Sequence, residues 1–269
     1  APDSISRAKF SATQERSIGV GALGFHALLQ KNNIAFESAL AKSLNNRVFK
    51  HIKGKLDEAN LELGNERGEA PDAVGTGKRF SHVMAIAPNA SSSIIMGNTS
   101  PSVEPYRANA YRQDTLSGAF LNKNKFLDKI IQEKCNGDSK LDYQEIWSSI
   151  IANDGSVQHL DFLDEWTKDV YKTGMEIDQR WVVDHAADRQ HYIDQAQSLN
   201  LFFRPDVNVK YLHAVHFQAW KQGLKTLYYC RSEKLAKADK VSKKIEREII
   251  QEIDLKQLAT EEVCLACEG

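Results

Sequence analysis

The chain has 269 residues, of which 42% are hydrophobic and 26% charged, so it can form one large domain or two small ones with a real core. A formal net charge of −1 excludes a general nucleic-acid binder, because such a protein needs excess positive charge to neutralise phosphates. There is no apolar run of about 18 residues and no secretory leader, so neither a membrane partner nor export is expected. Four cysteines are too few for a disulfide scaffold, and we expect the reducing cytoplasm as the compartment.

Helical spacing dominates the first 70 residues. Apolar residues three and four apart predict one helix over residues 17–30 and a second over residues 37–63. A loop rich in glycine and charged residues follows over residues 64–78. The N-terminal part of the chain is therefore predicted to be mostly helical.

Three short apolar stretches, residues 83–87, 199–203 and 225–229, are predicted to be strands. Strands separated by helices indicate an α/β fold with parallel pairing. Three strands are few for a chain of this length, which favours part of a larger barrel or sheet. The helices predicted around them cover residues 120–134, 143–152, 160–187 and 209–223, with Gly223 as the C-cap of the last.

From Arg231 onward Lys, Glu and Asp dominate, which predicts a tethered tail that ends in the pair Cys264-x-x-Cys267. Such a pair can be half of a zinc site, a thioredoxin-type active site or a mobile dithiol. Zinc needs a second ligand pair nearby and a thioredoxin site needs a following helix, and the sequence offers neither. A dithiol on an arm with a root-mean-square reach of about 30 Å fits best.

An irregular polar segment, residues 89–112, follows the first predicted strand, and binding sites tend to lie in such segments. Small and hydroxyl residues after a strand can offer main-chain N–H groups and serine Oγ atoms to phosphate oxygens. The segment lacks the glycines and the lysine of a P-loop, so an ordinary serine-rich turn is the alternative. The residues concerned are Pro88, Asn89, Ala90, Ser91 and Ser92.

Two further motifs have ordinary structural explanations. The G-x-G-x-x-G at residues 19–24 has no buried strand before it, so it is predicted to allow close packing of helices rather than to bind a dinucleotide. His213 and His216 lie one helical turn apart, and Asp188 with His191 gives one imperfect copy of a di-iron pair. No second copy exists, so no metal site is predicted.

Tyr228 and Tyr229 end the third predicted strand. Adjacent residues of a strand point to opposite faces. Alternation alone therefore predicts one buried and one exposed tyrosine.

Six stretches, in the same order, resemble the large (alpha) subunit of class I ribonucleoside-diphosphate reductase. The resemblance covers residues 15–231 and then the terminal cysteine pair. The stretches are residues 87–94 (APNASSSI), 99–105 (TSPSVEP), 155–158 (GSVQ), 197–202 (QSLNLF), 224–229 (LKTLYY) and 264–267 (CLAC).

The resemblance implies that residues 1–230 are the helix-rich C-terminal part of the ten-stranded α/β barrel of this family, and that residues 231–269 are a mobile redox tail. In the family, the radical-forming cysteine lies in an Asn-x-Cys-x-Glu sequence. This cysteine and the two cysteines that become oxidised all lie N-terminal of the phosphate loop. No such sequence occurs here, and Cys135 and Cys230 lie in other contexts. Because Ala1 stands where an initiator Met would, we expect a truncated sequence, a processed chain or a split-gene product. Since the family's cysteines are absent, the chain is expected to be active only with its N-terminal portion.

The resemblance also implies roles for three groups of residues. Pro88, Asn89, Ala90, Ser91 and Ser92 look like the loop that holds the substrate diphosphate, with Ala90 contributing main chain only. Tyr228 and Tyr229 look like the tyrosine pair that passes an oxidising equivalent towards the active-site cysteine. Cys264 and Cys267 look like the dithiol that re-reduces the active-site disulfide by thiol–disulfide exchange.

The implied activity is the radical reduction of ribonucleoside diphosphates to 2′-deoxyribonucleoside diphosphates for DNA synthesis. The implied partners are the N-terminal portion of the alpha subunit, the small (beta) subunit whose metal cofactor supplies the radical, and thioredoxin or glutaredoxin. No cofactor is expected to bind in this portion itself. The alternative is a non-enzymatic helical interaction domain with a redox- or metal-sensing CxxC tail, whose strands would then have open edges.

Overall fold

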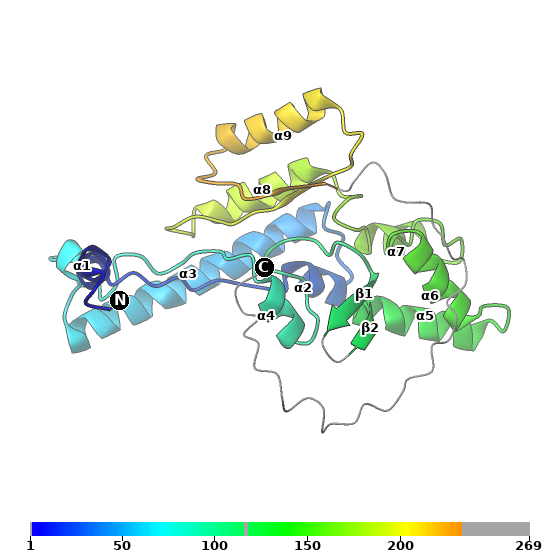
Figure 1. Ribbon diagram of the computed structural model, residues 1–269, viewed down its shortest axis with the longest axis horizontal. Helices are drawn as coiled ribbons and strands as arrows, with labels where there is room; N and C mark the ends of the chain where they lie inside the picture. The colour runs from blue at the N-terminus through cyan, green and yellow to red at the C-terminus, as the bar shows by residue number, and fades with distance from the viewer. Residues whose placement is uncertain (1, 116–117, 233–269) are drawn as a thin grey trace, which may run out of the picture. The chain divides into compact units, whose positions relative to one another are not determined.

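The computed structural model of the protein describes residues 2–115 and 118–232 (Figure 1). Its helices are α1 (Ser6–Glu15), α2 (Phe25–Lys31), α3 (Ala39–Arg67), the 3-10 helix η1 (Pro71–Ala73), α4 (Ala90–Ile95), α5 (Lys125–Gly137), α6 (Tyr143–Ala152), α7 (Glu165–Val170), α8 (Gln179–Gln190) and α9 (Val209–Lys221). Its strands are β1 (Ala110–Thr115), β2 (Gly118–Lys123), β3 (Leu201–Phe203) and β4 (Cys230–Ser232). Within these described residues, no helix combines the length and the apolar character needed to cross a membrane.

Three predicted helices are confirmed, and side-chain caps fix where they start. α6 has the predicted bounds, and the Asp142 carboxylate accepts the N–H of Glu145 at 2.8 Å. α3 begins after Ser38, whose hydroxyl accepts the N–H of Ala41 at 3.1 Å. α9 ends just before Gly223, whose φ of 77° is the left-handed conformation expected after a helix.

The helix predicted over residues 17–30 is wrong for its first half. α2 begins only at Phe25, and the preceding segment is extended, with Val20 in a parallel bridge to Met84. A Cβ on Gly21 would lie 2.8 Å from the carbonyl oxygen of Ala85, so the small residue allows two extended segments to approach. The glycine motif therefore packs strand-like segments and not helices.

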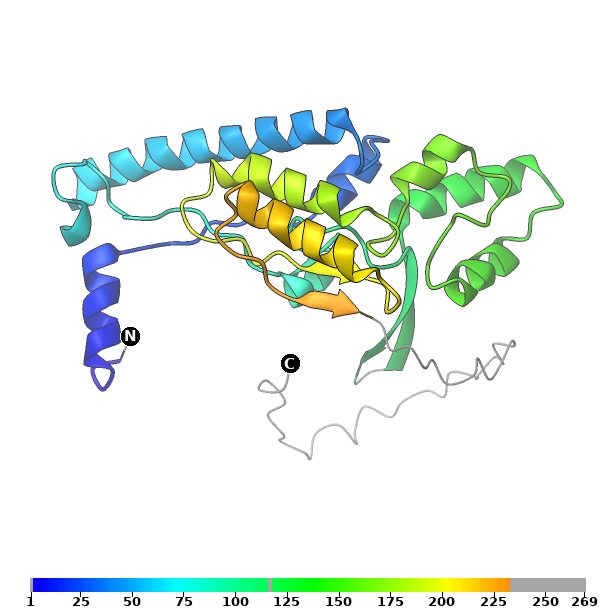
Figure 2. The same cartoon turned by 90° about the horizontal axis from the view of Figure 1, so that it is seen from above.

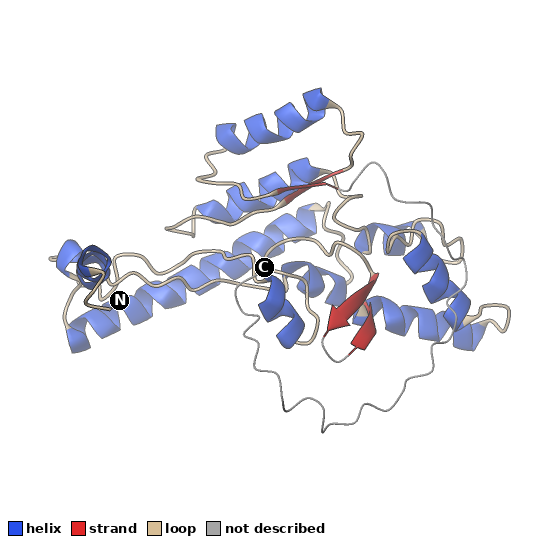
Figure 3. Ribbon diagram, viewed as in Figure 1, coloured by secondary structure: helices blue, strands red, loops and turns tan. Residues whose placement is uncertain are grey.

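Parallel pairing of extended segments confirms the α/β prediction, although the described residues contain no closed barrel. Val20 bridges Met84, Ile86 bridges Gln197, and β3 pairs with β4, all in parallel. Within the described residues, regular strand forms only two short pairs, β1 with β2 and β3 with β4 (Figure 3). The predicted strand at residues 199–203 is shortened to β3. The strand predicted at 225–229 is displaced to β4, because the hydrogen bonding of residues 226–229 to the neighbouring segment is irregular.

The segment before α5 forms a hairpin that was not predicted. β1 pairs with β2 in antiparallel register, and Figure 2 shows the hairpin extending on the side away from α3. The helix predicted over residues 120–134 therefore starts late, at Lys125, after Asn124 accepts the N–H of Phe126 at 3.1 Å. The single helix predicted over residues 160–187 is instead divided in two. α7 begins after its N-cap Asp164 and ends at Val170, and α8 begins only after its own N-cap, Asp178.

Two hydrophobic cores hold these elements together. The first is formed by α2, α3, α8, α9 and the parallel segments, and α8 contacts both α3 and α9 (Figure 1). The second lies among α5, α6 and α7, around the fully buried Trp147. The first core supports both of the predicted sites that lie within the described residues.

Two buried histidines are expected to make the fold sensitive to acid. Burial lowers the pKa of His26 to about 3 and that of His185 to about 4, from 6.5. The unfolded chain takes up these protons below pH 6.5 but the folded protein does not, so stability is full above that pH and falls towards the folded pKa values. At pH 5 the expected loss is about 2 kcal/mol for each histidine, measured by urea unfolding at pH 7 and pH 5.

Replacing a buried histidine should flatten this pH dependence. We expect His185→Gln to lower stability at pH 7 but to reduce the difference between the two pH values. His51 is exposed on α3, so His51→Gln serves as the control and should leave the difference unchanged. Equal stability of the unmodified protein at both pH values would contradict the assignment.

Candidate functional site

The predicted phosphate loop lies where the extended segment around Ile86 gives way to α4. Asn89 has a φ of 54°, a left-handed conformation that turns the chain into the helix. The side chain of the N-cap residue, Asn89, makes no hydrogen bond to the N–H groups of the first turn of α4. Pro88 and Asn89 are half-buried, whereas Ala90, Ser91 and Ser92 are exposed.

Two hydrogen bonds hold this loop in place on its buried side. Ser93 is buried and its hydroxyl donates to the carbonyl of Ala90 at 2.7 Å. The side-chain amide of Asn89 donates to the carbonyl of Ala22 at 3.4 Å, which joins the loop to the segment before α2. The exposed hydroxyls of Ser91 and Ser92 are thereby presented on a turn whose inner side is anchored.

The two tyrosines are both exposed, and their rings touch. Tyr228 is 48% exposed and Tyr229 53%, and their ring centroids are 4.1 Å apart with the planes inclined at 53°. The prediction of one buried and one exposed tyrosine is wrong, because the chain is not regular strand at the pair. The guanidinium of Arg231 lies 4.9 Å from the centre of the Tyr229 ring. A side-chain hydrogen bond with Tyr229 and the charge of that phenol raise the pKa of Tyr228.

The parallel segments bring the loop and the tyrosine pair to the same level of the sheet. Ile86, two residues before Pro88, bridges Gln197. On the other side of the same segment, the N–H of Tyr228 donates to the carbonyl of Leu199 at 2.8 Å. The loop and the tyrosine pair therefore begin on either side of one extended segment. Neighbouring strands lie about 5 Å apart.

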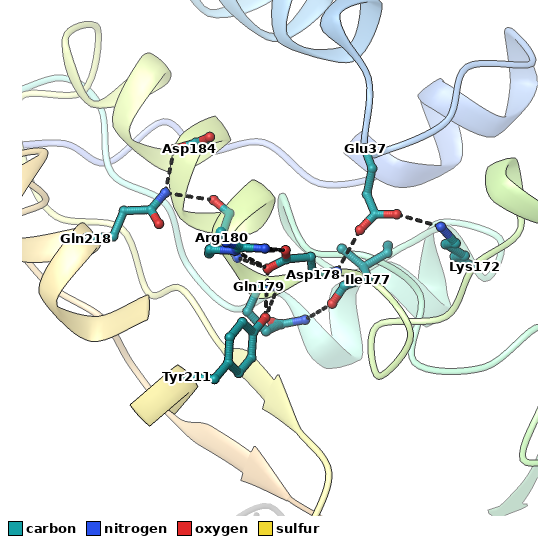
Figure 4. A network of polar contacts seen from close by, with 9 residues as sticks. All are labelled: Glu37, Lys172, Ile177, Asp178, Gln179, Arg180, Asp184, Tyr211 and Gln218. Atoms are coloured by element: carbon teal, nitrogen blue, oxygen red, sulfur yellow. Dashed lines mark hydrogen bonds and ion pairs between the residues drawn. The ribbon is translucent and has the colours of Figure 1, made fainter. Parts of the chain in front are cut away.

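A polar network fixes α9, the helix that precedes the tyrosine pair (Figure 4). The hydroxyl of Tyr211 donates to Asp178 Oδ1 at 2.8 Å and accepts the N–H of Gln179 at 2.8 Å. Two turns further along α9, the Gln218 amide donates to Asp184 at 2.7 Å. Burial alone would raise the pKa of Asp178, but hydrogen bonds from Arg180 and Tyr211 outweigh it and lower that pKa.

The same network continues to the start of α3. Glu37 accepts the main-chain N–H of Asp178 at 2.7 Å and the Lys172 ammonium at 2.7 Å (Figure 4). A cavity of about 270 Å³ borders it, lined in part by Phe203 and Tyr211. None of the predicted site residues that the structure describes lines this cavity, so we assign the network to holding α8 and α9 together.

The histidine and aspartate motifs take part in ordinary contacts. His213 stacks on Phe217 at 6.0 Å, and His216 Nδ1 lies 2.8 Å from the carbonyl oxygen of Leu212. Asp184 and Asp188 both face the ammonium of Lys42. Among the described residues, no three His, Cys, Asp or Glu side chains are grouped closely enough to hold a metal ion.

Comparison with known proteins identifies the family. The family model for the barrel domain of ribonucleotide reductase matches residues 3–76 and 71–230. The chain belongs to the ribonucleotide reductase barrel-domain family. The resemblance found in the sequence is thereby confirmed.

Relatives and a solved structure agree with this family. The chain is 59% identical over 244 residues to the ribonucleoside-diphosphate reductase large subunit of Invertebrate iridescent virus 6, covering 90% of this chain and 25% of that protein. It is 52% identical to the large subunit of Invertebrate iridescent virus 3, covering all of this chain and 41% of that protein. The class Id ribonucleotide reductase alpha subunit of Actinobacillus ureae matches with a TM-score of 0.75 and 44% identity, over 82% of this chain and 40% of that one. The chain thus spans less than half the length of these ribonucleotide reductase subunits.

Other predicted and unpredicted residues complete the site. Cys264 and Cys267 lie outside the described residues, as does the predicted tail beyond Ser232. β4 (Cys230–Ser232) extends across residue 230, where the barrel portion was predicted to end and the tail to begin. The sequence predicts no role for Glu104 or Asn200, and both are buried. Asn200 accepts the main-chain N–H of Tyr229, and Glu104 accepts the main-chain N–H of Asn200. Both occur in the stretches that resemble the reductase family, but nothing in the residue pattern marks them as buried partners.

Proposed function

We propose that this chain, together with the remainder of a large subunit, reduces ribonucleoside diphosphates to 2′-deoxyribonucleoside diphosphates in the cytoplasm. The observation that supports the proposal most is the arrangement of the loop at residues 88–92 and the tyrosine pair on either side of one extended segment. Membership of the ribonucleotide reductase barrel-domain family supplies the class of chemistry. It also disfavours the alternative of a non-enzymatic interaction domain.

The loop would bind the substrate diphosphate. The exposed hydroxyls of Ser91 and Ser92 can donate to phosphate oxygens, and the N–H groups of the first turn of α4 can do the same. Ala90 has no polar side chain and would contribute main chain only. Anchoring through Asn89 and Ser93 keeps these donors fixed before substrate arrives.

Tyr228 and Tyr229 would relay the oxidising equivalent. A small subunit with a metal cofactor would take one electron and one proton from the first phenol and leave a neutral phenoxyl radical. That radical would regain one electron and one proton from the second phenol, which becomes the phenoxyl in its turn. The touching rings allow the hole to pass from one phenol to the other, and exposure leaves the pair accessible to a partner. A cysteine in the remainder of the subunit would be the final donor.

Cys264 and Cys267 would restore the reductant. Reduction of one ribonucleotide oxidises two active-site thiols to a disulfide. The tail dithiol would transfer two electrons and two protons to that disulfide and become a disulfide itself. Thioredoxin or glutaredoxin would then reduce the tail.

The loop assignment predicts a binding defect. The double variant Ser91→Ala, Ser92→Ala in a complete large subunit should raise the KM for CDP about tenfold or more while kcat changes little, because hydrogen bonds to a charged group are lost. Steady-state CDP reduction with the small subunit and thioredoxin measures both constants. Ser43 is exposed on α3, so Ser43→Ala is the control. An unchanged KM in the double variant would show that these hydroxyls do not bind the diphosphate.

A further inference from the structure

The main chain at the tyrosine pair departs from a regular parallel ladder. β3 and β4 pair Leu201 with Cys230, and the N–H of Leu201 donates to the carbonyl of Tyr229 at 3.0 Å. In an evenly spaced parallel ladder, the next bond would run from the N–H of Tyr229 to the carbonyl of Leu199. That carbonyl instead accepts the N–H of Tyr228. The irregularity leaves the N–H of Tyr229 outside the ladder.

The side chain of Asn200 accepts a hydrogen bond from this N–H. Asn200 Oδ1 accepts it at 3.2 Å, and Asn200 itself is only 4% exposed. A buried main-chain donor without an acceptor is costly, so an acceptor here stabilises the irregular conformation. Because this conformation breaks the strand alternation, both tyrosine rings lie on the exposed side and touch.

Asn200 is in turn fixed by Glu104. The carboxylate Oε1 accepts the main-chain N–H of Asn200 at 2.9 Å, and Glu104 is 2% exposed. Burial raises the pKa of Glu104, while its hydrogen bonds with Asn200 and the positive charges of Arg231 and Arg189 oppose that rise. Arg189 is itself buried and bonded to Gln197 and Asn45, so it forms no direct pair with Glu104 within the described contacts.

Glu104 belongs to the segment that follows the phosphate loop. The N–H of Thr99 donates to the carbonyl of Ser93 in α4, and the segment is anchored to the start of α2. There the N–H of Phe25 donates to the carbonyl of Ser102 at 3.3 Å, and the N–H of Ala27 donates to the Ser100 hydroxyl at 3.0 Å. The chain over residues 99–104, together with the hydrogen bonds of Glu104 and Asn200, therefore links α4 to Tyr229.

We propose that Asn200, fixed by Glu104, is a positioning residue that sets the main chain of Tyr229 relative to the phosphate-loop segment and so aligns the two rings for radical transfer. The proposal rests on the proposed function. It adds to that function a pair of buried residues that act through the main chain of Tyr229. Its effect should appear in the rate of turnover and in the geometry of the radical, and not in substrate binding.

Asn200→Ala in the complete large subunit tests this role. With the small subunit and thioredoxin, we expect kcat for CDP reduction to fall about tenfold or more and the KM for CDP to stay within about twofold, because the loop is untouched while the ring geometry is lost. Asn60 is the matched control. It is also buried, and its side chain bonds the main chain of Phe80 in both directions, so Asn60→Ala should cost similar stability without a selective fall in kcat.

A spectroscopic readout separates positioning from general destabilisation. An aminotyrosine placed at Tyr229 should give a trapped radical whose β-proton hyperfine splitting reports the ring orientation by electron paramagnetic resonance. Asn200→Ala should change or broaden that splitting, whereas Asn60→Ala should leave it as in the unmodified subunit. An unchanged splitting together with an unchanged kcat would overturn the proposal.

A charge exchange tests the pair even if Asn200→Ala fails to fold. Asn200→Asp keeps an acceptor for the N–H of Tyr229 but brings two carboxylates together, so activity should fall. Adding Glu104→Gln should restore at least part of it, since the pair again holds one carboxylate and one amide. No recovery in the double variant would contradict the coupling. If Tyr229→Phe were fully active, the relay itself would be wrong, whereas an active parent subunit with indifferent Asn200 variants would overturn only this inference.

Discussion

Replacing either tyrosine of the pair by phenylalanine is expected to abolish turnover, with kcat lowered by about 10³-fold or more, equivalent to about 4 kcal/mol. Phenylalanine lacks the hydroxyl whose proton and electron leave together, so the relay would be broken at Tyr228 or Tyr229. Both side chains are about half exposed, so the substitution removes no buried hydrogen bond and should leave folding and diphosphate binding intact. The measurement is steady-state CDP reduction by the complete large subunit, with CDP affinity determined separately.

Tyr192→Phe is the matched control for this experiment. Tyr192 is half-buried and packs against the first core. We expect this variant to keep nearly full activity. Normal turnover in Tyr228→Phe or in Tyr229→Phe would remove that residue from the relay.

Cys264→Ser is expected to abolish multiple turnover when thioredoxin is the reductant, but not when a small dithiol is used. A serine cannot form a disulfide, so the tail can no longer transfer electrons to a buried active-site disulfide. A small dithiol can diffuse to that disulfide directly and does not need the tail. The measurement is the rate of CDP reduction with each reductant in turn.

Cys135→Ser controls for the loss of a thiol elsewhere. Cys135 is a free, partly exposed cysteine on α5, and its replacement should change neither rate. Equal loss of activity of Cys264→Ser with both reductants would indicate that the residue acts in another way. If Cys264→Ser were as active as the unmodified subunit with both reductants, the tail pair would not be needed for turnover.

The helices could be predicted because their signal is local. α6 has the predicted bounds, and α3 and α9 differ from prediction by a few residues at their ends. The failures occur where tertiary contacts decide. The segment around Val20 has helical spacing but is extended, because Gly21 allows close approach to Ala85.

The candidate site was only partly visible in the sequence. The stretches that resemble the family indicated the loop and the tyrosine pair, but strand alternation gave the wrong exposure for the tyrosines. Alternation assumes a regular ladder, and the irregularity at Tyr229 depends on an acceptor from Asn200. Glu104 could not have been recognised, because an acidic residue in a polar segment is expected to be exposed, and here it is buried.

The most direct test of the account is CDP reduction by this chain combined with the remainder of a matching large subunit and a radical-bearing small subunit, with thioredoxin as reductant. We expect deoxycytidine diphosphate to form only in the complete mixture and to disappear when this chain is omitted. A stable complex of all parts that forms no product would contradict the claim that this chain contributes a working phosphate loop and tyrosine relay.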